Sequence, residues 1–235
     1  MRNRKYDEIR DVEIIPHFQK KPYGSVLYRQ GETVVLCSAQ VLENVPDWLK
    51  NESSGWLTAE YSMLPGSSET RIFRDRGHVN GRSKEIERLI GRTLRASVDL
   101  KKLGQRTIWV DCDVVQADGG TRTASITGGF LAMYLAIKRL MKEEKIQENP
   151  IKYQVAAVSV GMVNGVQMLD LSYEEDSQAD VDLNVAMTSD MRFVEIQGTS
   201  EREPLSEENL HELLKLAKKG IAKLLEKQRE VMENV

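Results

Sequence analysis

The sequence predicts an α+β fold in which two halves each contribute β-hairpins followed by helices, giving mixed sheets that pack against helices. Three observations favour this class. Runs rich in β-forming residues and separated by short turns occur in both halves, runs with a helical apolar period follow them, and a charged connector over residues 142–150 separates the halves. We expect a single domain over residues 1–235, built from a duplicated unit that is not visible as a residue-level repeat.

The composition is that of a folded globular protein. Hydrophobic residues make up 40% of the 235 residues and charged residues 29%, and 33 basic against 36 acidic side chains give a net charge of −3. These values argue against extended disorder and against a globally polycationic binder. The charged N-terminus lacks the apolar stretch of a secretory signal, and no run reaches the roughly 20 apolar residues of a membrane span. We therefore expect a cytoplasmic protein without a membrane segment.

The first half predicts a hairpin, a third strand and an amphipathic helix. Residues 25–41 contain two β-rich runs around a turn at Gly31, and residues 56–64 form a further run before the loop-like composition that follows Pro65. A helix is expected from Ser83 onward. Its apolar face comprises Ile86, Leu89, Ile90 and Leu94, and a basic stripe on another face comprises Arg88, Arg92 and Arg95.

A strand over residues 107–116 leads through a glycine-containing loop, residues 117–123, into a second helix. The apolar face of that helix comprises Ile126, Phe130, Met133, Ile137 and Met141. Strand, glycine loop and helix therefore follow one another directly along the chain.

The second half predicts two further hairpins. Residues 153–171 turn at Asn164-Gly165, a pair that accepts positive φ and is a strong hairpin signal. Residues 182–197 turn at Ser189-Asp190.

The last helix is expected to begin after Ser206 and to run nearly to the C-terminus. Ser206 is its N-cap, and Leu205 packs against Leu210 as a hydrophobic staple. Its apolar stripe comprises Leu213, Leu214, Ala217, Ile221, Leu224 and Leu225.

The glycine loop has the features of an anion site. In Asp118-Gly-Gly-Thr-Arg-Thr123 the glycines let backbone amides approach a ligand, the helix start offers unpaired N–H groups, and Thr121 and Arg122 add a hydroxyl and a guanidinium. Phosphate would bind well there, although a plain strand-to-helix turn with Arg122 paired to a surface acid explains these residues equally well. Neither a Walker loop nor a dinucleotide fingerprint is present, which argues against ATP and NAD.

A second arginine, Arg82, stands between Gly81 and Ser83 at the start of the first helix. Two arginines at two helix starts could hold one phosphate if the starts converge in space. Viewed alone, Arg82 is more simply a solvated arginine beside a helix-capping serine.

Hard oxygen ligands gather over residues 169–184. Asp176 and Asp182 suit Mg²⁺, which commonly takes one or two carboxylates and completes its coordination with waters or substrate oxygens. The chain must bend between the two aspartates for both to bind one ion. An acidic surface turn is the alternative interpretation.

Positive charge concentrates in Arg71, Arg74 and Arg76 and in the basic stripe of the first helix. A local basic patch can bind a polyanion by releasing counterions even in an acidic chain, although solvated arginines fit the same pattern.

Cysteine and histidine give no sign of a metal site. Cys37 and Cys112 each lie inside a strand-like run, where a buried thiol is favoured over a disulfide. The three histidines are scattered and no Gly-x-Ser-x-Gly motif is present, which argues against zinc and serine hydrolases.

Several stretches together resemble the ribonuclease PH family of bacterial phosphate-dependent exoribonucleases, which trim the 3′ ends of tRNA precursors. The resemblance covers almost the whole chain, and the run over residues 118–123 is its most specific part. The matching stretches are residues 24–27, 57–65, 81–92, 111–128, 169–176 and 194–199. The last of these, with Glu-Ile-Gln-Gly-Thr, looks more like the bacterial enzyme than like exosome ring subunits.

The resemblance implies a phosphorolytic 3′-to-5′ exoribonuclease that uses inorganic phosphate as co-substrate and releases nucleoside diphosphates, and that can add nucleotides in reverse. Inorganic phosphate would be held by Arg82, Gly120, Thr121 and Arg122. Asp176 and Asp182 would serve catalysis and bind Mg²⁺.

The resemblance further implies RNA contacts through Arg71 and Arg74, tRNA precursors and other structured RNA, including rRNA, as substrates, and a homo-oligomeric ring of six subunits. A non-catalytic RNA-binding ring subunit of an exosome-like complex is the alternative, because it needs only the basic surface. Three departures from the family bear on the tRNA contacts. Asp11 replaces a usual proline, Gly66 replaces a common arginine, and the loop over residues 75–80 is about two residues short.

Overall fold

The computed structural model describes residues 2–74, 80–202 and 204–235. Its first half forms a five-stranded sheet in the order β1-β2-β3-β5-β4, in which only the β4–β5 pair is parallel. The strands are β1 (Val12–Pro16), β2 (Gly24–Gln30), β3 (Thr33–Leu42), β4 (Trp56–Met63) and β5 (Thr107–Gln116). The 3₁₀ helix η1 (Asp47–Leu49) lies between β3 and β4.

The second half forms a four-stranded sheet in the order β7-β6-β8-β9. Its strands are β6 (Val155–Val163), β7 (Val166–Leu169), β8 (Val181–Thr188) and β9 (Phe193–Ser200). All three pairings are antiparallel, so the expectation of mixed sheets is confirmed for the first sheet and is wrong for the second. The parallel pair arises only where a helix crosses over between β4 and β5.

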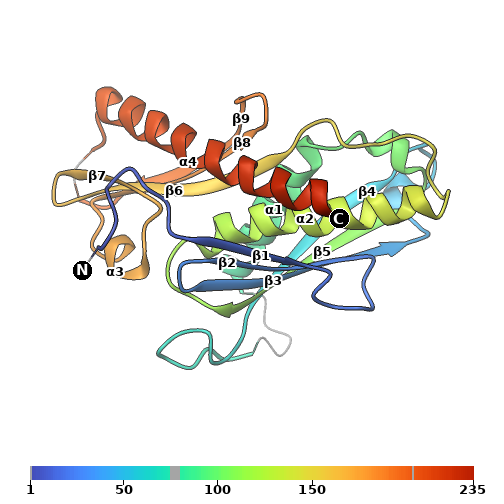
Figure 1. Ribbon diagram of the computed structural model, residues 1–235, viewed down its shortest axis with the longest axis horizontal. Helices are drawn as coiled ribbons and strands as arrows, with labels where there is room; N and C mark the ends of the chain where they lie inside the picture. Colours follow the sequence, from blue (N-terminus) through green and yellow to red (C-terminus); the bar gives the residue numbers. More distant parts are fainter. Residues whose placement is uncertain (1, 75–79, 203) are drawn as a thin grey trace.

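Four α-helices accompany the sheets within the described residues: α1 (Gly81–Ala96), α2 (Thr121–Lys142), α3 (Tyr173–Asp176) and α4 (Glu207–Asn234). A further 3₁₀ helix, η2 (Leu100–Leu103), precedes β5. Figure 1 shows α2 running through the middle of the molecule, with the first sheet on one side and α4 on the other. None of the helices described is long and apolar enough to cross a membrane.

Strand β6 explains how the two halves share one interior. Val155 and Ala157 point into the core formed with α2, whereas Ala156 and Val158 point into the core formed with α4. Because side chains alternate across a strand, a strand covered on both faces needs apolar residues at successive positions, and β6 has them. The polar side chain of Gln228 ties the same layers together, because its Nε2 donates to the carbonyls of Thr127 at 3.0 Å and Val155 at 2.9 Å.

Most of the predicted elements are confirmed. The β6–β7 hairpin turns at Asn164 and Gly165 with φ of 50° and 76°, the positive values that this pair tolerates. The β2–β3 hairpin turns at Gly31, and the β8–β9 hairpin turns after Thr188. Ser206 caps α4 by accepting the Asn209 N–H at 3.2 Å. Leu205 and Leu210 both pack on the second core, as the staple requires.

Some sequence expectations were wrong or incomplete. The first helix begins at Gly81, and its N-cap is Asn80, whose side chain accepts the Arg82 N–H at 3.1 Å; Ser83 therefore lies inside the helix and does not cap it. Met141, expected on the apolar face of α2, is 37% exposed, and Leu140 beside it is the buried residue at this end of the helix. Strand β1 and the single-turn helix α3 were not predicted.

Candidate active site

The connection between β5 and α2 places a glycine loop directly on the acidic segment of the second half. Gly119 and Gly120 have φ of 72° and 64°, in the left-handed region that favours glycine. A Cβ on Gly119 would lie 2.4 Å from the carbonyl oxygen of Leu171, so only glycine allows this approach. The loop and the acidic segment, more than 50 residues apart in sequence, are thus in backbone contact.

All six residues predicted to bind phosphate or metal line one cavity of about 110 Å³. They are Arg82, Gly120, Thr121, Arg122, Asp176 and Asp182. Arg82 comes from the first turn of α1 and Thr121 and Arg122 from the first turn of α2, so the two helix starts converge. The positive end of each helix dipole and its unpaired N–H groups favour an anion between them.

The bend required between the two aspartates is made by α3 and the turn that follows it. Asp176 is the last residue of α3 and Asp182 lies at the start of β8. A capping box starts the helix: the Ser172 hydroxyl accepts the Glu175 N–H at 3.5 Å, and the Glu175 carboxylate accepts the Ser172 N–H at 2.9 Å. Asp182 in turn accepts a hydrogen bond from the Thr199 hydroxyl on β9 at 2.9 Å.

The surroundings of Asp176, which include Asp182, disfavour its charged form. Burial raises the pKa of the Asp176 carboxyl, the negative charge of Asp182 raises it further, and Arg122 and Arg82 partly offset both effects. A bound cation would remove this cost, which is one reason why the pair fits Mg²⁺. Within the described residues, no cluster of three or more His, Cys, Asp or Glu side chains could hold a metal ion. An ion at this site would therefore take most of its ligands from water or substrate oxygens.

Neighbouring side chains hold the phosphate-binding candidates in place. The Thr121 hydroxyl lies 2.9 Å from the hydroxyl of Tyr61, a residue of β4 whose pKa is raised by burial. Arg122 donates to the side-chain oxygen of Gln197 on β9 at 3.2 Å and lies 3.9 Å from the carboxylate of Glu85 on α1. The pairing of Arg122 with a surface acid is thus present, but it leaves Arg122 on the cavity wall.

Three further residues of this cavity were not singled out from the sequence: Met63, Ser159 and Asn184. Ser159 and Asn184 are opposite each other in the β6–β8 pair, and the Ser159 hydroxyl accepts the Leu171 N–H at 3.0 Å. Asn184 follows Asp182 by two residues in one strand, a spacing that puts both on the same face. This two-residue period of a strand was the sequence signal that could have identified Asn184 as a residue of the site.

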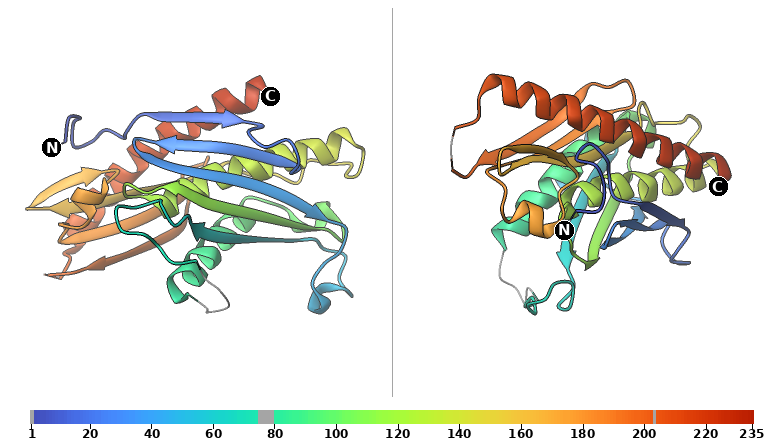
Figure 2. Two further views of the ribbon diagram at one scale, coloured as in Figure 1. Left: turned by 90° about the horizontal axis from the view of Figure 1, so that it is seen from below. Right: turned by 60° about the vertical axis from the view of Figure 1, so that its left-hand side comes forward.

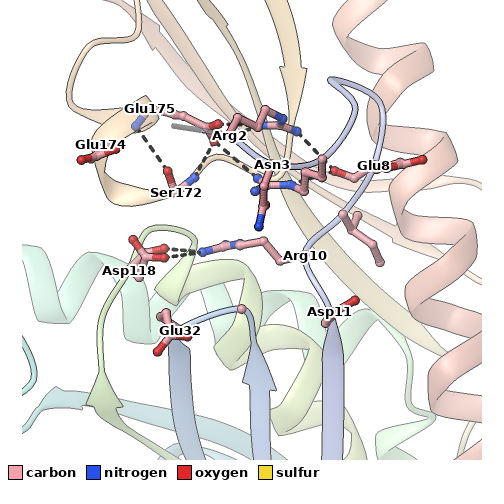
Figure 3. A pocket seen from close by; sticks show the side chains of 13 residues that line it. Arg2, Asn3, Glu8, Arg10, Asp11, Glu32, Asp118, Ser172, Glu174 and Glu175 are labelled. Carbon is pink, nitrogen blue, oxygen red and sulfur yellow. Dashed lines mark hydrogen bonds and ion pairs between the residues drawn. The ribbon is translucent and has the colours of Figure 1, made fainter.

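Arg10, also missed from the sequence, is a buried link between the glycine loop and the acidic segment. Its guanidinium pairs with the Asp170 carboxylate at 2.6 Å, donates to the carbonyl of Asp118, and lies 3.6 Å from the Asp118 carboxylate. Figure 3 shows Arg10 pointing at Asp118, with Arg2 reaching Glu175 above it. Arg2 holds Glu175 through two contacts of 2.9 Å. The N-terminal segment therefore fixes both parts of the site.

The predicted RNA-binding arginines lie beside the phosphate cavity and outside it. Arg74 lines a second cavity of about 240 Å³, to which Arg82 and Met63 also belong. Arg71 is exposed, with its guanidinium 5.2 Å from the ring centroid of Phe73. Arg76 and residues 75–79 of the shortened loop lie outside the described residues.

The basic stripe of α1 is largely engaged with the protein itself. Arg92 pairs with Glu195 at 2.8 Å, and Arg95 stacks 4.5 Å over Trp56 while donating to the Leu57 carbonyl at 2.9 Å. Burial and the neighbouring Arg92 charge lower the pKa of Arg95. These contacts favour a structural role for at least two of the three stripe arginines.

The two other departures from the family pattern lie away from the phosphate cavity. Asp11 lines a separate cavity of about 560 Å³ at the N-terminal segment. Gly66 is exposed, and a Cβ there would meet no atom within 4 Å, so the site has room for the side chain it lacks.

Comparison with known proteins is consistent with this geometry. Residues 8–138 match the model of the 3′ exoribonuclease family, domain 1, and residues 153–220 match that of domain 2. The chain is 54% identical over 232 residues to a ribonuclease PH of Syntrophomonas wolfei, covering 98% of this chain and 97% of the relative. It is 56% identical over 236 residues to a ribonuclease PH of Bacillus pumilus, covering 99% and 97%.

Solved structures share the fold. A chain of the Archaeoglobus fulgidus exosome with RNA bound to the active site superposes with a TM-score of 0.79 at 26% identity, covering 95% of this chain and 90% of that one. Rice Rrp46 superposes with a TM-score of 0.78 at 18% identity and 97% coverage of both chains, a likeness of fold alone.

Proposed function

The chain belongs to the 3′ exoribonuclease family and is a phosphorolytic 3′-to-5′ exoribonuclease; we propose that its reaction takes place in the cavity between the starts of α1 and α2. The observation that carries this proposal is the convergence of two arginines, two helix starts and two aspartates on one small cavity. A non-catalytic ring subunit would need none of these residues together.

Arg82 and Arg122, with the Thr121 hydroxyl and the Gly120 amide, hold inorganic phosphate as the co-substrate. An oxygen of that phosphate attacks the phosphorus of the last internucleotide linkage. The bond from this phosphorus to the 3′-oxygen of the preceding nucleoside breaks, the 3′-oxygen takes up the proton that the attacking hydrogen phosphate carried, and the terminal nucleotide leaves as a nucleoside diphosphate. Positioning and charge stabilisation supply most of the catalysis, because two anions must approach each other.

Asp176 and Asp182 would hold Mg²⁺. When bound, the ion offsets negative charge on the phosphoryl oxygens. The paired carboxylates support this role because burial and the negative charge of Asp182 raise the pKa of Asp176, and a cation beside both would favour its ionised form. In either direction one P–O bond of the attacked phosphorus breaks and another forms. The reaction is therefore reversible, and nucleotides can be added from nucleoside diphosphates.

The substrates are the 3′ ends of tRNA precursors and other structured RNA, with Arg71 and Arg74 contacting the RNA backbone. The active form is a homo-oligomeric ring of six subunits. The identity to ribonuclease PH and the superposition on exosome chains support this assembly.

Incubation of an end-labelled tRNA precursor with and without inorganic phosphate tests the proposal. Shortening should require phosphate, and the released nucleotide should be a nucleoside diphosphate. Release of monophosphates at a rate indifferent to phosphate would contradict phosphorolysis. A subunit without catalysis would leave the RNA intact under both conditions.

A further inference from the structure

The segment between β4 and α1 is hydrogen-bonded to the end of β5 and to the connection that carries the glycine loop. The Leu64 N–H donates to the Val114 carbonyl at 3.0 Å, and the Ala117 N–H donates to the Ser67 carbonyl at 2.7 Å. The segment also contains an internal hydrogen bond, in which the Ile72 N–H donates to the Pro65 carbonyl at 2.9 Å. Figure 2 shows this segment, in teal, projecting beside the start of α1.

Phe73 is the most exposed large apolar side chain of the described residues, at 82%. An exposed phenyl ring on a loop adds nothing to the core. Its neighbours are cationic: Arg71 stacks against it, with the guanidinium carbon 5.2 Å from the ring centroid, and Arg74 follows it in sequence. An aromatic ring between arginines is the arrangement that binds single-stranded nucleic acid, since the ring stacks on bases and the arginines contact phosphates.

The position of Phe73 relates it to the reaction. Phe73 lines the cavity of about 240 Å³ described above, together with Tyr61 and Arg74. Met63 and Arg82 line both this cavity and the phosphate cavity, so the two are adjacent. An RNA strand whose last linkage lies at Arg82 therefore has Phe73 beside it.

We propose that Phe73 is a stacking platform for an unpaired nucleobase near the 3′ end of the RNA, a contact that deepens, and rests on, the function proposed above. An enzyme that removes nucleotides one after another must hold strands of any sequence. Stacking suits this need because every base has a flat face, whereas hydrogen bonds to base edges would select sequences. Arg71 occupies one face of the ring, and the base takes the other.

Fluorescence of 2-aminopurine measures stacking directly. Single-stranded oligonucleotides carrying this base at one of the last five positions are titrated with the full-length protein in phosphate-free buffer, which prevents phosphorolysis. At one or two positions the wild type should quench the fluorescence. Phe73→Leu, which keeps an apolar side chain without the ring, should not quench, and Phe73→Trp should restore quenching.

Affinity and kinetics provide the second readout. Phe73→Leu should weaken binding of a single-stranded oligonucleotide at least about fivefold, since stacking on an aromatic ring contributes roughly 1–3 kcal/mol per base. The difference between wild type and Phe73→Leu should disappear when the stacked nucleotide is made abasic. The KM for phosphate should stay unchanged. Phe18→Leu is the control, because Phe18 is also exposed, at 50%, and lies outside both cavities.

Two results would overturn the proposal. Equal quenching by wild type and Phe73→Leu at every position would show that the ring contacts no base. Loss of the oligomer in Phe73→Leu, seen by light scattering and reversed in Phe73→Trp, would show that the ring packs against a second copy of the chain. If phosphate-dependent release of diphosphates is present while the stacking signal is missing, the proposed function stands and only the stacking site is wrong.

Discussion

Arg10 and Asp170 form an ion pair, Nη2 to Oδ1 2.6 Å, whose side chains are 7% and 1% exposed. The Asp170 carboxylate also accepts the backbone N–H of Arg10 at 2.7 Å and its Nε–H at 3.0 Å. The same guanidinium donates to the Asp118 carbonyl, so one side chain joins the N-terminal segment, the glycine loop and the acidic segment.

Removing Arg10 should therefore destabilise the protein strongly. Arg10→Ala leaves the Asp170 charge buried without its partner, and losses of this kind amount to about 3–5 kcal/mol. Chemical denaturation measures the change in the free energy of unfolding. Arg29→Ala is the matched control, because the Arg29–Glu13 pair is about half exposed and should contribute less than about 1 kcal/mol. Similar losses in the two variants would mean that Arg10 is not a buried anchor.

The same pair should make the fold sensitive to acid. Burial acts to raise the pKa of the Asp170 carboxyl, but the charge and hydrogen bonds of Arg10 outweigh it, and the pKa lies below its usual value. A carboxyl whose native pKa is depressed stabilises the fold above its unfolded pKa of about 3.9, and the contribution is lost as the pH falls through the native value. Unfolding free energies between pH 6 and pH 3 should fall more steeply for the wild type than for Asp170→Asn. Parallel curves would contradict this linkage.

Asp182→Asn should abolish turnover while RNA binding survives. The change removes a hard oxygen ligand and one negative charge but keeps the shape of the side chain and leaves Arg71 and Arg74 untouched. Single-turnover phosphorolysis and RNA binding are measured on the same preparation. Asp180→Asn is a control, since Asp180 pairs with Arg202 at 3.0 Å and does not line the phosphate cavity. Normal turnover by Asp182→Asn would remove this residue from the site.

Local signals in the sequence were sufficient to predict most of the helices, strands and turns, because turns and helix caps depend on neighbouring residues. Asn164-Gly165 and Ser206 are examples: each has the backbone conformation or hydrogen bond that its residue type favours. Strand β1 was not predicted from the sequence because it has only five residues and lies at the edge of the sheet, with β2 as its one neighbour. The single turn α3 is too short for a helical period to be visible.

Contacts between distant segments could not be predicted from residue patterns. The sequence allowed Asp176 and Asp182 to approach each other, but the contact of Arg122 with Gln197 depends on how β8 and β9 pair. Arg10 and Asp170 lie 160 residues apart, and no local rule relates them. The resemblance to a family assigned roles to other residues of its motifs but none to Arg10 or Asp170, although Asp170 lies within the matching stretch 169–176.

The protein should behave in solution as a multimer well above the 26.7 kDa of one chain. The expectation follows from the proposed ring, in which surfaces exposed on the single chain are covered. Exposed apolar side chains on different elements, such as Ile15 at 40% and Ile196 at 45%, are available for such contacts. Light scattering at micromolar concentration measures the mass. A monomer that retained full activity would contradict the ring.

The two groups of arginines should have separate roles. Arg82 and Arg122 line the phosphate cavity, whereas Arg74 lines only the adjoining cavity and Arg71 is exposed beside Phe73. Arg122→Ala should therefore raise the KM for phosphate and slow the chemical step, because it removes a charge from a small anion that must be positioned for attack. RNA affinity should change little.

Arg74→Ala should have the opposite pattern. Losing one backbone contact should weaken RNA binding, reduce the slope of log affinity against log salt by about 0.7–0.9, and matter more for a tRNA precursor than for a short oligonucleotide. Kinetics measured against phosphate at saturating RNA, and against RNA at saturating phosphate, distinguish the two variants. The division of roles requires both patterns: if Arg122→Ala changed only RNA affinity, or Arg74→Ala only the phosphate dependence, the assignment of these arginines would be wrong even though the enzyme is phosphorolytic.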